Sequence, residues 1–134
     1  MTLNYLVDTD VFSLMVKGQD ASINTRLQTL AKGEAMLSVI TAGEFYYGVA
    51  HAPVSKLRDQ RAQRLLDFFG LLPLDAEVAA SYGTVRADLR RAGTPIGPNE
   101  LWLAAQALAH GLTMVTRNTR EFQRVKGLKV EDWL

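Results

Sequence analysis

The chain has 134 residues, of which 48% are hydrophobic and 22% charged, with a formal net charge of +1. This length suits one core, so we expect a single domain over residues 1–134. No apolar run reaches about 18 residues, which argues against a membrane-spanning helix. The absence of cysteine excludes disulfides and thiolate metal sites. The first residues lack the basic and apolar regions of a signal peptide, and we expect a cytoplasmic protein.

Apolar segments alternate with amphipathic ones along the chain. The pattern predicts strands at residues 5–7, 36–40, 71–74, 112–115 and 128–130. Helices are predicted at residues 11–16, 23–30, 41–50, 57–69, 76–92 and 98–110, with a turn around Glu121. Short strands separated by helices predict the α/β class, as a three-layer α/β/α sandwich with a mostly parallel sheet.

Acidic residues follow several of these predicted strands. Asp8 comes directly after the first strand, Glu44 after the second, and Glu121 after the strand at residues 112–115. Glu100 is the third residue of the helix that begins at Pro98. In parallel sheets, functional groups gather beyond the carboxyl ends of the strands. We therefore expect these acids at one edge of the sheet.

Most of these acids also have a purely structural interpretation. Thr41 with Glu44, and more loosely Asn118 with Glu121, have the spacing of a capping box. Glu100 stands where a helix dipole favours an anion by about 0.3–1 kcal/mol. Taken singly, each of these acids is better explained by a helix terminus than by a site.

Asp8 is the acid that these interpretations leave out. Asp10 is the predicted N-cap of the helix from residue 11, so Asp8 has no capping role. A carboxylate at the end of a buried strand needs a partner, because desolvating a charge is expensive. A divalent cation would serve if the acids converge, and hard oxygen ligands favour Mg²⁺ or Mn²⁺. Such a site suits hydrolysis of a phosphodiester.

Three groups of basic residues accompany the acids. They are Arg58, Arg61 and Arg64; Arg86, Arg90 and Arg91; and Arg117, Arg120, Arg124, Lys126 and Lys129. Each group can follow a phosphate backbone, although a solvated helix face is the commoner explanation for each one taken singly.

Four segments resemble the motifs of PIN-domain ribonucleases, and more closely the VapC toxins of bacterial toxin–antitoxin pairs. They are LVDTD (residues 6–10), SVITAGEFYYG (38–48), GTPIGPNELWLAA (93–105) and VTRNTREF (115–122). The resemblance implies a PIN-like fold and a Mg²⁺- or Mn²⁺-dependent endoribonuclease. It also implies a homodimer, a cognate VapB-type antitoxin as partner, and structured RNA such as initiator tRNA as substrate.

Carried over residue by residue, the resemblance assigns the metal-binding acids and two supporting residues. The first to fourth acids are Asp8, Glu44, Glu100 and Glu121; Asn118 supports the site, and the Thr116 hydroxyl orients ligands or water.

This chain departs from the family at the third acid. The family has aspartate in Asn-Asp-Leu, whereas this chain has Asn99-Glu100-Leu101. The extra methylene moves the carboxylate by roughly 1–1.5 Å, and a misplacement on that scale can lower activity about 100-fold. Two functions stay open, an active nuclease and a weakened or inactive domain that binds RNA or an antitoxin. A haloacid-dehalogenase-like phosphatase is a weaker alternative, because Asp8-Thr9-Asp10 fits that motif only in part.

Overall fold

The computed structural model describes residues 2–134. Its centre is a five-stranded sheet in the order β3-β2-β1-β4-β5, in which every pairing is parallel. The strands are β1 (Tyr5–Val7), β2 (Ala35–Ser38), β3 (Leu71–Leu72), β4 (Thr113–Val115) and β5 (Lys129–Glu131). Seven helices accompany them: α1 (Thr9–Lys17), α2 (Ala21–Thr29), α3 (Val39–His51), α4 (Lys56–Phe69), α5 (Ala76–Arg91), α6 (Pro98–Ala109) and α7 (Thr119–Phe122). The predicted α/β/α fold is confirmed.

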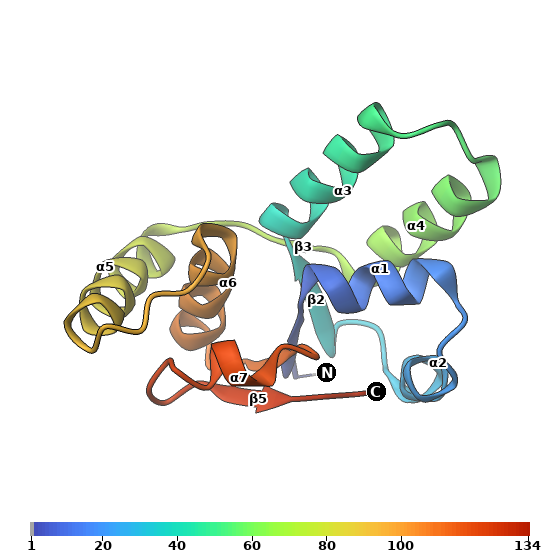
Figure 1. Ribbon diagram of the computed structural model, residues 1–134. Helices are drawn as coiled ribbons and strands as arrows, with labels where there is room; N and C mark the ends of the chain where they lie inside the picture. Colours follow the sequence, from blue (N-terminus) through green and yellow to red (C-terminus); the bar gives the residue numbers. More distant parts are fainter. Residues whose placement is uncertain (1) are drawn as a thin grey trace.

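The helices cover the sheet from two sides. Because successive side chains of a strand point to opposite faces, Val7 packs among the residues of α1, α2 and α4, while Leu6 packs with those of α5 and α6. Figure 1 shows the same division, with α5 and α6 on one side of the sheet and α1, α2 and α4 on the other. Burial on both faces explains why the strands are short apolar runs rather than alternating ones.

Two predicted helix starts are wrong, and both errors hide the role of an acid. Helix α1 begins at Thr9, so Asp8 and not Asp10 occupies the N-cap position. Helix α3 begins at Val39 with Ser38 as its cap, whose hydroxyl accepts from the Ile40 N–H at 3.0 Å. The strand predicted at residues 36–40 therefore ends at residue 38.

The helix start at Val39 also removes the capping box predicted for Thr41 and Glu44. Thr41 is a fully buried residue inside the helix, one turn before Glu44. The looser box at Asn118 and Glu121 is wrong in the same sense, because the Asn118 side chain caps no N–H group of α7. Both acids are thus left free for other contacts.

Helix α3 extends away from the sheet, and α4 returns toward it and packs against α1, as Figure 1 shows. Ser55 caps α4 through its contact with the Arg58 N–H. In the part of the chain that the structure describes, no helix combines the length and the apolar character needed to cross a bilayer.

Candidate active site

Asp8 occupies the centre of the site because of the sheet topology. It follows β1, the central strand, whose two neighbours β2 and β4 are reached by the chain in opposite directions. A reversal of this kind is where ligands bind in open α/β sheets. The Asp8 N–H donates to the Val115 carbonyl at 2.9 Å, which locks the end of β1 onto the end of β4.

One hydroxyl holds the Asp8 carboxylate. Thr116, fully buried after β4, donates from Oγ1 to Asp8 Oδ2 at 2.7 Å, and its oxygen accepts from the Asn118 N–H at 2.9 Å. Asp8 itself is only 6% exposed. The predicted support by Thr116 therefore has a direct structural basis, because the backbone at Asn118 orients the hydroxyl toward the acid.

The surroundings of Asp8 disfavour its negative charge. The pKa of Asp8 is raised from 3.8 to about 6, chiefly by burial, with the charges of Asp10 and Glu100 acting in the same direction and the hydrogen bonds from Thr116 and from the Thr9 backbone opposing them. None of the groups that shift this pKa is a lysine, arginine or histidine. A buried acid whose charged neighbours are acids is the arrangement that a cation would stabilise.

Glu44 is tied to the same end of the sheet by two threonines. Thr9, the residue after Asp8, donates from Oγ1 to Glu44 Oε1 at 2.7 Å and lies 3.0 Å from Thr41 Oγ1. A threonine hydroxyl has a single proton. Since Thr9 gives its proton to Glu44, Thr41 must donate in the second bond. Neither contact is evident from the sequence, because Thr41 has the spacing of a helix cap and Thr9 meets Glu44 only across 35 residues of chain.

Glu121 and Asn118 hold the loop that precedes α6. Glu121 accepts from the Gly97 N–H through Oε1, at 3.0 Å, and from the Asn118 side-chain amide through Oε2. Arg124 adds a bond from its guanidinium to the Pro95 carbonyl at 2.9 Å. Asn118 thus supports this side of the site, and Glu121 is engaged with both oxygens in positioning the loop. Its assignment as a fourth metal ligand stays a prediction.

Glu100 stands where the sequence predicts, at the third position of α6. Its side chain turns back over Gly97, so that a Cβ at that position would overlap the carboxylate. A glycine therefore makes room for the longer acid of this chain. The motif contains the signal for this contact, since Gly97 lies three residues before Glu100, but only coordinates show which way the side chain turns.

The acids share one edge of the sheet without forming a finished metal cage. Within residues 2–134, no three acidic or histidine side chains lie close enough together to hold a metal ion. The charges of Asp10 and Glu100 raise the pKa of Asp8. Glu44 is linked to this group by its hydrogen bond from Thr9, the residue next to Asp8. The carboxylate and hydroxyl donors fit Mg²⁺ or Mn²⁺ in chemical type. Asp10, expected only as a cap, belongs to this group as well.

Comparison with known proteins agrees with the geometry. The PIN domain family model matches residues 5–128. The chain is a PIN domain. This PIN domain is 34% identical over 131 residues to the tRNA(fMet)-specific endonuclease VapC of Shigella flexneri, and the match covers 98% of each protein. It is 32% identical over 132 residues to the ribonuclease VapC2 of Haemophilus influenzae, over 98% of this chain and 99% of the relative.

Solved structures resemble the PIN domain over its whole length. The crystal structure of VapBC2 from Rickettsia felis, bound to a DNA fragment from its promoter, superposes with a TM-score of 0.90 at 27% identity, covering 98% of this chain and 100% of that one. DNA-bound VapBC from Salmonella typhimurium gives 0.84 at 32% identity, covering 99% and 100%. The chain therefore belongs to the VapC ribonucleases within the PIN family.

Proposed function

We propose that this PIN domain is the endoribonuclease toxin of a toxin–antitoxin pair and hydrolyses RNA with the help of Mg²⁺ or Mn²⁺. The observation that carries the proposal is Asp8, a buried acid at the switch point of the sheet. Its own neighbours raise its pKa, and no basic group offsets them. The VapC relatives, named as ribonucleases, support the reaction class.

Each residue of the site has a distinct role in this proposal. Asp8, Glu44 and Glu100 would hold the cation, with Glu121 as a further ligand. The bound cation would supply an activated water and stabilise charge on the phosphate. Thr116 fixes the Asp8 carboxylate, and the Thr41–Thr9 pair fixes Glu44. Asn118 and Glu121 hold the loop that carries the third acid.

Structured RNA, tRNA in particular, is the substrate class that we propose. The support is the Shigella relative, named as a tRNA(fMet)-specific endonuclease. Arg86 and Arg90 of α5, together with the exposed arginines of the segment after β4, would face the phosphate backbone. We place the enzyme in the cytoplasm, where such RNA is found.

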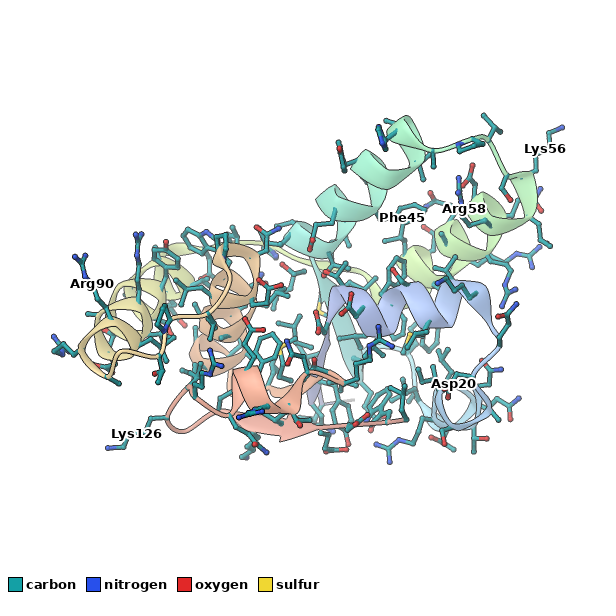
Figure 2. All side chains as sticks on the ribbon, in the orientation of Figure 1. Asp20, Phe45, Lys56, Arg58, Arg90 and Lys126 are labelled. Atoms are coloured by element: carbon teal, nitrogen blue, oxygen red, sulfur yellow. The ribbon has the colours of Figure 1, made fainter. Side chains whose placement is uncertain are left out.

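A VapB-type antitoxin is the proposed protein partner, because the solved neighbours are VapBC complexes. A cavity of about 300 Å³ lies beside Thr9 and Glu44 and is lined from α1, α3 and α4. Phe45 on α3 and Arg58 on α4, both labelled in Figure 2, are among its walls. An antitoxin segment bound there would lie next to the acids. The exposed side chains of Val39 and Tyr47, 37% and 70% accessible, offer a surface for the proposed homodimer.

One observation favours a second function, a domain that binds RNA or antitoxin but cuts weakly. The acids do not form a metal cage in the described residues, and Glu100 is turned toward Gly97. A phosphatase gains no comparable support, because no lysine is among the groups that influence Asp8.

Cleavage of tRNA-rich RNA by antitoxin-free protein in Mn²⁺, with an EDTA control, tests the proposal. The parent, Asp8→Ala and Glu100→Asp proteins are compared. Discrete metal-dependent cuts by the parent that vanish in Asp8→Ala support an active toxin. Cuts that appear only in Glu100→Asp support the weakened domain. Cleavage by Asp8→Ala at the parent's rate would overturn the site assignment.

A further inference from the structure

A second cavity lies against the loop that leads to Glu100. It has a volume of about 400 Å³, within the range of small-molecule sites, and lies between α5, the loop at residues 93–97 and the first turn of α6. Its walls include Tyr82, Arg86, Arg90, Pro95, Ile96 and Pro98. The cavity and Glu100 therefore share the first turn of α6.

The two arginines of this cavity are free to bind an anion. Neither Arg86 nor Arg90 forms an ion pair with any described residue, whereas Arg91 on the same helix pairs with Asp88 at 2.6 Å. No acidic residue is found among the described residues that line the cavity. Arg90 is exposed, and Figure 2 shows it extending from α5. A phosphate is the anion that such a pair suits.

An aromatic surface completes the cavity. The ring of Tyr82 stacks on Trp102, with centroids 3.8 Å apart and planes inclined by 14°. The guanidinium carbon of Arg86 lies 5.9 Å from the centroid of the Tyr82 ring, and Arg86 donates to the Tyr82 hydroxyl at 2.9 Å. Trp102 is not part of the wall, so it supports the tyrosine from behind. A fixed aromatic ring next to a cation is how proteins hold an unpaired base.

The loop beside the cavity is held firmly at two points. Arg124 binds the Pro95 carbonyl and Glu121 binds the Gly97 N–H. These two hydrogen bonds shape the cavity wall. They also position Gly97, the residue directly before α6. An RNA nucleotide bound in the cavity would fix the position of the RNA backbone relative to the acids. It would not itself contact the metal ion.

We propose that this cavity binds one unpaired nucleotide of the RNA substrate. Its base packs against Tyr82 and its phosphate contacts Arg86 and Arg90. The inference rests on the proposed function, and it explains how the acid site would select its RNA substrate. It predicts a preference for RNA that presents a flexible, unpaired base at a set distance from the cut.

Binding of a labelled single-stranded RNA oligonucleotide in EDTA, measured by fluorescence anisotropy over a salt series, tests the arginines. Arg86→Ala and Arg90→Ala should each weaken binding about tenfold and lower the salt slope by about 0.7, the value for one phosphate contact on a single strand. Arg91→Ala is the matched control. It removes a neighbouring arginine that already has an acidic partner, and should change affinity less than about twofold.

An abasic scan of the same oligonucleotide tests the aromatic wall. Removing the base at one position should weaken binding by the parent about tenfold, in line with the loss of one base–aromatic stack. Tyr82→Phe keeps the ring and should show the same difference. Tyr82→Leu should bind the intact and the abasic RNA equally.

The outcomes separate this inference from the proposed function. A parent that neither binds nor cuts RNA overturns both. A parent that cuts RNA while Arg86→Ala and Arg90→Ala behave like Arg91→Ala overturns the nucleotide site alone. A third result, in which the arginine variants sediment as a smaller species with unchanged RNA affinity, makes the cavity a contact between protein copies and also overturns it.

Discussion

Asp8 and Glu100 are both acids of the proposed site, but the molecule holds them in different ways. Asp8 lies at the junction of the central strand and α1, is 6% exposed, and is bound by the buried Thr116. Glu100 is half-buried in the first turn of α6, next to a glycine loop. The first acid is placed by the sheet itself. The third is placed by one loop and is the position at which a longer side chain can be accommodated.

Replacing Asp8 should have the largest effect on activity. Asp8→Asn keeps an acceptor for Thr116 but removes the charge that would hold the cation, and we expect cleavage to fall by about 10³-fold or more. The folded structure should persist, which circular dichroism checks alongside the RNA cleavage assay. Asp10→Asn is the matched control in the same turn, with a smaller loss. Equal activity of Asp8→Asn and parent would remove Asp8 from the site.

The same substitution should change how stability depends on pH. The folded protein binds the Asp8 proton more tightly than the unfolded chain, since burial raises its pKa to about 6. The contribution of Asp8 to the free energy of unfolding should therefore be fully present below about pH 4 and should be lost as the pH rises to about 6, a loss of at most about 3 kcal/mol. Urea unfolding in EDTA should show this loss as a difference between the pH profiles of the parent and Asp8→Asn. A parallel pH profile in both proteins would contradict the burial of this charge.

Gly97→Ala should disturb the other acid without touching Asp8. The added methyl group would displace the Glu100 carboxylate, and we expect activity to fall about tenfold, on the scale of a misplaced catalytic group. Aspartate at position 100 is shorter and should avoid the clash. Gly97→Ala should therefore have little effect in a Glu100→Asp background, and equal losses in both backgrounds would place Glu100 elsewhere. The cleavage rates of the parent, Gly97→Ala, Glu100→Asp and the double variant form a double-mutant cycle that measures this coupling.

The smallest effect is expected at Thr41, two contacts away from the metal-binding groups. Thr41→Val removes the hydroxyl that donates to Thr9 and should weaken the hold on Glu44, lowering activity about fivefold, on the scale of one hydrogen bond. Thr41→Ser keeps the hydroxyl and should retain activity. The dependence of the cleavage rate on Mn²⁺ concentration is the decisive measurement, because a purely structural loss would leave the half-saturating concentration unchanged.

The two acids also differ in how far the sequence predicts them. The alternation of short strands and helices predicts the sheet, and the rule on carboxyl ends then predicts Asp8 and its neighbours. Local spacing points to Asp10 and Thr41 as helix caps, whereas α1 begins directly after β1 and α3 directly after β2, so that Asp8 and Ser38 are the caps. The direction in which a side chain points cannot be predicted from the sequence alone. The turn of Glu100 over Gly97 and the use of both Glu121 oxygens on the loop depend on contacts between segments, and only the structure shows them.

The bond between Thr116 and Asp8 spans 108 residues, and the Thr116 N–H in turn binds the Glu131 carbonyl. The acid thus receives its fixed position from a residue that is synthesised 108 residues later. Chains grow at about 5–20 residues per second, and parallel strands pair late because distant segments must first meet. A partly made chain has Asp8 without its partner strand. The proposed site is therefore incomplete until the chain has grown past β4 and β5 and these strands have joined the sheet beside β1.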